Sequence, residues 1–109
     1  MHNQSDIYTK DQYYEAIIQL RPKSEEIIKF IENQISKRKD VFISKIVEKK
    51  FGIDFYITSQ RFARSLGKKI KDNFMGELKI TRSLHTRNRQ TSRDVYRGTV
   101  LFRVKEDNE

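Results

Sequence analysis

The chain has 109 residues and a net charge of +8, with 35% charged and 36% hydrophobic residues. This length accommodates one domain with a single modest core. Cysteine is absent, which excludes disulfides, thiolate chemistry and cysteine-ligated zinc sites. No apolar run approaches the length of a membrane span and no basic-then-apolar leader is present, so we expect a cytoplasmic protein without a membrane span or signal peptide.

The positive charge lies almost wholly in the second half of the chain. Residues 1–59 carry ten Lys or Arg against nine Asp or Glu, whereas residues 60–104 carry twelve against three. This asymmetry suggests a polyanion partner for the second half, although a basic balance also serves solubility. We divide the chain into a flexible N-terminal arm (1–12), a single α+β domain (13–104) and an acidic tail (105–109).

The first expected strand covers residues 13–20, where branched and aromatic side chains fill both faces, and Pro22 ends it. Residues 23–38 have helical periodicity, with Ser24 as the N-cap and isoleucines along one side. Residues 41–49 form the next expected strand. A short connection through Gly52 leads into a third strand, in which Ile53, Phe55 and Ile57 alternate with polar residues, so we expect an antiparallel hairpin.

Ser59 is the expected N-cap of a second helix over residues 60–74. Its apolar side chains fall within an arc of about 120°; they are Phe62, Ala63, Leu66, Ile70 and Phe74. Its cations fall within about 80° on the opposite side; they are Arg61, Arg64, Lys68 and Lys71. No acidic residue of this helix precedes Asp72, so we expect one oily face and one cationic face.

Two further strands are expected at residues 77–85 and 94–104, joined by a polar loop over residues 86–93. The element order is therefore β-α-β-β-α-β-β. This order predicts an α+β fold of the ferredoxin-like β-α-β-β-α-β type, with an extra C-terminal strand that forms a hairpin and extends the sheet.

The terminal hairpin is rich in arginine, whose planar guanidinium suits phosphate oxygens and stacks on bases. Its cations are Lys79, Arg82, Arg87, Arg89, Arg93, Arg97 and Arg103, and His85, Asn88, Gln90, Thr91 and Ser92 add uncharged donors. The alternative is a merely solvated charged loop. Four tyrosines would stack on bases if they were exposed on an open sheet face, although core or interface packing is the more ordinary role; they are Tyr13, Tyr14, Tyr56 and Tyr96.

The sequence offers no converged catalytic constellation. His85 lies beside a basic loop with no carboxylate partner in evidence. Glu15, Glu48 and Asp54 lie in or near adjacent expected strands and would form a metal-binding cluster if they met, but scattered strand carboxylates are commonly solvated. No glycine-rich phosphate loop follows a strand. We therefore expect no enzyme activity, no cofactor and no metal site.

Three short motifs resemble the nonsense-mediated-decay-three (Nmd-three) family, with the closest likeness to its archaeal branch. They are Tyr13-Tyr-Glu-Ala-Ile-Ile-Gln-Leu-Arg21, Gly52-Ile-Asp-Phe-Tyr56 with Ser59 and the helix after it, and Asp94-Val-Tyr-Arg97 with Thr99. The likeness spans nearly all of residues 13–104. Members of this family act on the large ribosomal subunit, as nuclear-export adaptors in eukaryotes and, in archaea, to assist its maturation or to keep it from premature use.

The chain departs from this family in one large respect. Family members carry paired Cys-x-x-Cys zinc ribbons ahead of the first motif, and this chain contains no cysteine. The zinc-dependent part of the family's activity therefore does not transfer, and the eukaryotic export signals match no residue here.

The resemblance and the charge pattern together predict a non-catalytic module that binds the large ribosomal subunit through its ribosomal RNA. We expect the contact residues to face one direction; they are Arg61, Arg64, Lys68, Lys71, Lys79, Arg82, His85, Arg87, Arg89, Arg93 and Arg97. The alternative is a protein–protein adaptor that docks ribosomal proteins or maturation factors by a sheet face or the final edge strand. A third, weaker alternative is a carboxylate–metal nuclease.

Overall fold

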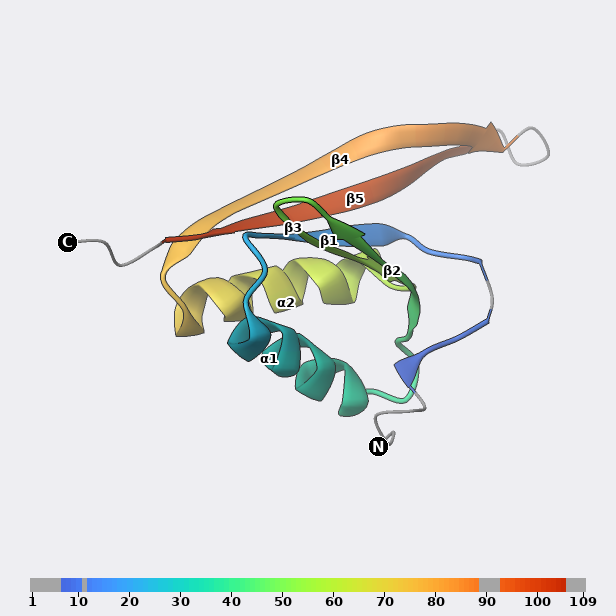
Figure 1. Ribbon diagram of the computed structural model, residues 1–109. Coiled ribbons are helices and arrows are strands. Elements are labelled where there is room, and N and C mark those ends of the chain that lie inside the picture. The colour runs from blue at the N-terminus through green and yellow to red at the C-terminus, as the bar shows by residue number, and fades with distance from the viewer. Residues whose placement is uncertain (1–6, 11, 89–92, 106–109) are drawn as a thin grey trace.

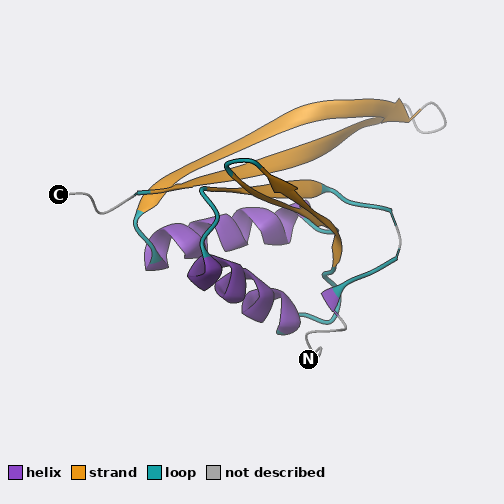
Figure 2. Cartoon of the chain, in the orientation of Figure 1, coloured by secondary structure: helices purple, strands orange, loops and turns teal. Residues whose placement is uncertain are grey.

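The computed structural model describes residues 7–10, 12–88 and 93–105, with the backbone alone at residues 84–88 and 93–95. Its strands are β1 (Ala16–Arg21), β2 (Ile43–Lys49), β3 (Gly52–Ile57), β4 (Gly76–Asn88) and β5 (Arg93–Val104), and its helices are α1 (Glu25–Ser36) and α2 (Gln60–Asn73). The strands form one sheet, and both helices cover the same face of it (Figures 1 and 2). The predicted α+β, ferredoxin-like fold with an extra strand is confirmed.

The extra strand lies inside the sheet and not at its edge. The strand order is β2-β3-β1-β5-β4, with β5 parallel to β1 and antiparallel to β4. The expectation of a final edge strand is therefore corrected, because the edge next to β5 is formed by β4. Val100 and Phe102 of β5 are fully buried, whereas β4 is more polar, so this order places the more apolar strand between two neighbours.

Both helices begin at the predicted serines. The Ile27 amide donates to Oγ of Ser24 at 3.4 Å, and the Phe62 amide donates to Oγ of Ser59 at 3.1 Å. These bonds satisfy amides that have no partner in the first turn of a helix. With 12 residues in α1 and 14 in α2, neither helix of the described chain is long and apolar enough to cross a bilayer.

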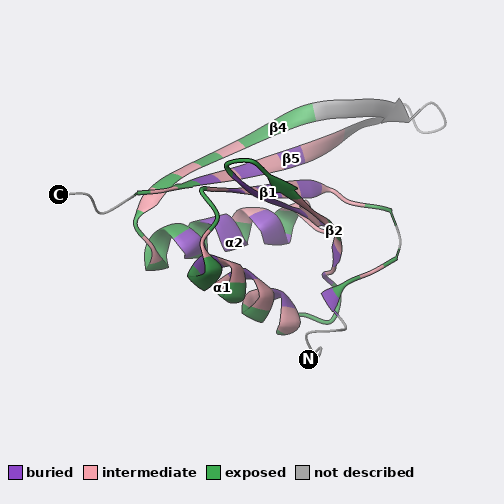
Figure 3. Ribbon diagram, in the orientation of Figure 1, coloured by how far each residue is buried: buried purple, intermediate pink, exposed green. Residues whose placement is uncertain are grey.

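The core lies between the helices and the sheet. Ile18 of β1 pairs with Phe55 of β3 on one side and with Val100 of β5 on the other, and all three side chains are fully buried. A Cβ atom at Gly67 would lie 2.6 Å from Cγ1 of Val100, so the missing side chain lets α2 approach β5 closely. Figure 3 shows buried, half-buried and exposed residues alternating along α2.

Part of the predicted flexible arm contacts the domain. Ile7 is 0% exposed and belongs to the core, and the Thr9 amide donates to the Ile43 carbonyl at 3.0 Å. The Tyr8 hydroxyl donates to a carboxylate oxygen of Glu32 on α1 at 3.3 Å. The segment has no periodicity because it lies beside β2 as an isolated bridge and not as a strand, so pattern analysis missed it. Residues 1–6 and 11 lie outside the described part of the chain.

The terminal hairpin is longer than predicted. β4 and β5 pair as far as Asn88 and Arg93, with a register shift between Leu84 and Thr86, so residues expected in the loop belong to strands. A two-stranded ribbon is held by backbone hydrogen bonds, which need no alternation of apolar residues, and the polar sequence therefore concealed it. The remaining predicted loop residues, 89–92, lie outside the described chain, as do residues 106–109 of the predicted acidic tail.

Candidate nucleic-acid interface

Four cations lie along the outer side of α2, and we call them the α2 basic face: Arg61, Arg64, Lys68 and Lys71. Arg61, Lys68 and Lys71 are exposed, whereas Arg64 is half-buried and its Nη1 donates to Oε1 of Gln60 at 3.2 Å. The row extends about 15 Å at the rise of an α-helix. Among the described residues, no carboxylate lies within ion-pair distance of any of the four.

A carboxylate from outside the helix supports the start of α2. The first turn of α2 contains no acidic residue, although anions are favourable at a helix N-terminus. Glu15, just before β1, accepts a hydrogen bond from the Gln60 amide at 2.9 Å. Because Glu15 supplies this anion, the N-terminus of α2 is supported although no acidic residue of the helix precedes Asp72.

The hairpin cations that the structure describes lie on both sides of the sheet. Arg82 is opposite Gly98 in the register and stacks 4.5 Å from the ring of Tyr96, whose carbonyl accepts from Nε2 of Gln60 at the start of α2. Arg82 is therefore on the helix side. Arg97 and Lys79 alternate with core-facing residues and lie on the opposite side. The expectation that all contact residues face one direction is thus corrected, because successive strand residues point to opposite faces.

One surface cavity at the β4 edge is lined by a cation of the α2 basic face and by cations of the hairpin. It has a volume of about 510 Å³ and contains Lys71 of α2, Lys79 of β4 and Arg103 of β5 in its lining, together with Glu77. Two of the predicted contact residues, Lys71 and Lys79, therefore line the same cavity. Arg103, which was not among the predicted contact residues, lines it with them. Arg103 belongs to the hairpin cations noted in the sequence, but only the register of β5 on β4 places it beside Lys79.

A second cavity, of about 310 Å³, lies at the start of α2 and includes Arg61 and Arg38 in its lining. Arg38 follows α1, stacks 5.3 Å from the Phe62 ring and forms an ion pair with Asp40 at 3.3 Å. Sequence reasoning missed Arg38, because the mixed charges around α1 gave no signal that it would lie beside α2.

Four predicted contact residues have no described side chain. Arg87 and Arg93 lie on the paired backbone of β4 and β5, His85 lies at the register shift of β4, and Arg89 falls outside the described residues. Their contribution to an interface stays a prediction.

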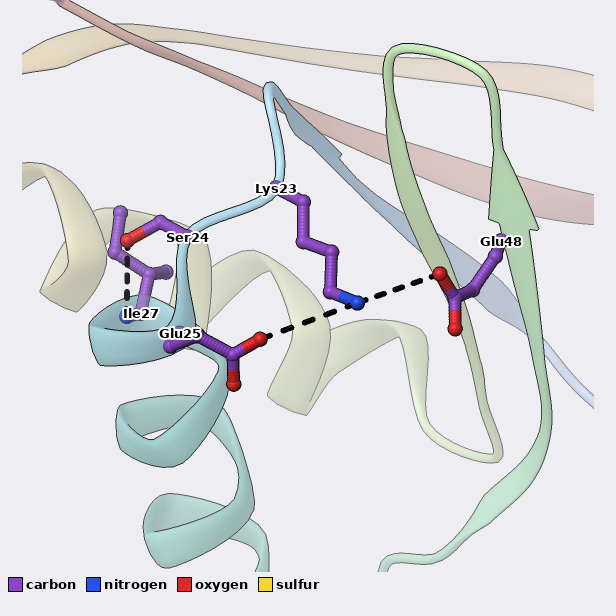
Figure 4. Close-up of polar contacts among 5 residues, drawn as sticks. All are labelled: Lys23, Ser24, Glu25, Ile27 and Glu48. Atoms are coloured by element: carbon purple, nitrogen blue, oxygen red, sulfur yellow. Dashed lines mark hydrogen bonds and ion pairs between the residues drawn. The ribbon is translucent and has the colours of Figure 1, made fainter.

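The three carboxylates considered as a metal cluster have separate partners. Glu15 accepts from the α2 amide, Glu48 pairs with Lys23 at 3.3 Å (Figure 4), and Asp54 pairs with Arg21 at 2.6 Å. The Asp54 contact is an ion pair without hydrogen-bond geometry. Within the described part of the chain, no three potential metal ligands come together.

Tyr13 is tied to the same carboxylate that supports α2. Its hydroxyl donates to Oε2 of Glu15. This hydrogen bond, with smaller effects of burial and of the Glu15 charge, raises the pKa of Tyr13 to about 12, while Arg97 acts in the opposite direction. Tyr13 thus fixes the side chain of Glu15 in its position at the start of α2.

Comparison with known proteins identifies the family of the chain. No protein of curated function matches the sequence significantly. The family model described as "NMD3, second domain" matches residues 13–104, which is most of the chain. The chain therefore belongs to the NMD3 family, a ribosome-associated family, and this membership implies a ribosome-related function.

Proposed function

We propose that the chain is a non-catalytic module that binds the large ribosomal subunit by contacting ribosomal RNA through the α2 basic face. Family membership supports the ribosomal partner. The observation that carries the RNA contact is the row of four cations on α2 without a carboxylate partner among the described residues. In this role it resembles factors that assist maturation or export of the subunit.

The proposed contacts are to phosphates. Exposed lysine and arginine side chains bind backbone oxygens, which gives affinity with little sequence specificity. Arg82 on the helix side and the cavity that contains Lys71, Lys79 and Arg103 extend the basic surface from α2 to the β4 edge. A phosphate backbone that follows α2 would therefore meet cations from three elements.

The test compares two triple variants with equal loss of charge. The first combines Arg61→Gln, Lys68→Gln and Lys71→Gln on the α2 basic face. The control combines Lys29→Gln, Lys37→Gln and Lys39→Gln, three exposed cations on and after α1. We expect the first variant to bind purified large subunits roughly tenfold or more weakly at low salt, and the control to bind much as the unchanged chain does. Equal weakening of both variants would contradict the assignment of this face.

The second candidate function is a protein–protein adaptor. β4 is a sheet edge of 13 residues, and an edge strand can take up a further strand from a partner. Binding to subunits that persists at high ionic strength and is insensitive to the α2 variant would favour this function.

A further inference from the structure

The sheet has one face that neither helix covers, and we call it the open face. Ile18 and Leu20 of β1 are fully buried under the helices, while Ile17 and Gln19, which alternate with them, are half-buried on the other side. Figure 1 shows both helices on a single side of the sheet. The open face therefore consists of alternate residues of all five strands, and their chemistry determines what it can bind.

A row of stacked side chains crosses this face in the order of the strands. Nζ of Lys45 on β2 lies 4.5 Å from the ring centroid of Tyr56 on β3. The Tyr56 ring is 4.8 Å from that of Tyr14, which precedes β1, at an interplanar angle of 84°. Cζ of Arg97 on β5 lies 4.0 Å from the Tyr14 ring. With strands about 4.8 Å apart, the row is about 14 Å long, with aromatic rings in the centre and a cation at each end.

The charge of the open face is positive around this row. Lys49, Lys79 and Arg103 add exposed cations, by the alternation of β2, β4 and β5. Its described acidic residues are Asp54, which is 3% exposed and paired with Arg21, and Glu77, which is opposite Arg103 in the register. The described residues at these strand positions therefore carry a net positive charge.

We propose that the open face binds single-stranded RNA, with bases stacked on the row formed by Lys45, Tyr56, Tyr14 and Arg97 and with phosphates held by the surrounding cations. Aromatic rings and guanidinium planes accept any base by stacking, and cations alongside them follow the backbone. The bases of an RNA duplex are stacked within the helix and cannot use the rings. An acidic peptide would satisfy the charge but would leave the aromatic centre without a role.

This inference deepens the proposed RNA-binding function but uses the opposite side of the sheet from α2. It predicts a preference that phosphate contacts alone would not produce, namely tighter binding of unpaired RNA than of duplex RNA. The two surfaces can therefore fail independently.

The experiment measures fluorescence anisotropy of a short labelled oligouridylate and of an RNA duplex of equal length with the whole chain. The variants are Tyr14→Leu with Tyr56→Leu, which removes the rings, and Tyr14→Phe with Tyr56→Phe, which keeps them. We expect the Leu pair to bind the single strand about tenfold or more weakly, and the Phe pair within about twofold of the unchanged chain. Equal affinity for single strand and duplex, or equal binding by the two pairs, would overturn the inference.

Two further measurements separate binding at the open face from binding at α2 and from binding of an acidic protein. The ratio of dissociation constants between the Leu and Phe pairs should be the same when Arg61, Lys68 and Lys71 are replaced by glutamine, because these three residues lie on α2 and not on the open face. Polyglutamate of matched charge should displace the oligonucleotide poorly, and efficient displacement would instead indicate an acidic protein partner. If the Leu pair does not fold, amide shifts of the unchanged chain with the oligonucleotide decide: shifts at Ile17, Tyr56 and Thr99 support the inference, and shifts confined to α2 refute it.

Discussion

Arg21 and Gly52 form a contact that neither the strand pattern nor the charge pattern indicates. The Arg21 guanidinium lies across β3, where Nη1 donates to the carbonyls of Leu20 and Ile53 at 3.0 and 3.3 Å and Nη2 pairs with Asp54. Breaking a buried ion pair leaves an uncompensated charge, so Asp54 depends on this arginine. Gly52 was expected in a turn, whereas in the structure its missing side chain makes room for Arg21.

Replacing Gly52 by alanine should therefore destabilise the fold. The new Cβ would lie 2.2 Å from the Leu20 carbonyl oxygen and 2.6 Å from Cδ of Arg21, and a backbone atom of a central strand cannot move aside. We expect a loss of about 1–3 kcal/mol in the free energy of unfolding, measured by urea denaturation. Gly98→Ala is the matched control, since its nearest neighbour would be 3.7 Å away. Similar losses in both variants would refute this explanation.

We expect the hydrogen bond between Tyr13 and Glu15 to make the stability of the fold depend on pH at high pH. The pKa of Tyr13 in the folded chain is about 12, above the ordinary tyrosine value of 10.0, so the stability that this bond contributes is complete below pH 10 and is lost as pH rises toward 12. The measurement follows tyrosinate absorbance as the pH is raised. The titration that disappears in the Tyr13→Phe variant should be the one with a pKa of about 12. Glu15→Gln should return it toward the ordinary value. A Tyr13 transition at the ordinary pKa in the unchanged chain would contradict the geometry.

At the scale of elements, local signals were sufficient for the helices but not for the strand order. Ser24 and Ser59 mark helix starts through contacts within a few residues, and both predictions are confirmed. The pairing of β5 with β1 joins residues far apart in the sequence, such as Ile18 and Val100, and no local pattern specifies it. The apolar face of β5 indicated burial, but a strand at the edge or inside the sheet would show the same face.

Amide hydrogen exchange distinguishes a β5 strand inside the sheet from one at its edge. Amides from Gly98 to Phe102 should exchange slowly at every residue, because β5 has hydrogen-bonded neighbours on both sides. Alternate amides of β4 should exchange faster, because this strand lies at an edge. Fast exchange at alternate positions of β5 would show that it is itself the edge strand.

At the scale of the whole molecule, the sequence predicted the net positive charge better than it predicted which surfaces the cations occupy. The α2 basic face was predicted correctly from helical periodicity, since one helix presents one outer side. The hairpin cations were expected to face one direction, whereas Arg82 and Lys79 lie at strand positions that point to opposite faces of the sheet. The tyrosines of the open face were considered for stacking, but their row with Lys45 and Arg97 depends on the strand order and was not predictable.

The salt dependence of binding to large ribosomal subunits tests the central claim most directly. Each phosphate contact contributes about 0.7 to 0.9 to the slope of log K against log salt concentration. Replacement of Arg61, Lys68 and Lys71 by glutamine should therefore make that slope shallower by about two, while the Lys29, Lys37 and Lys39 control keeps the slope of the unchanged chain. A slope that is the same for all three proteins would show that the α2 basic face does not contact ribosomal RNA.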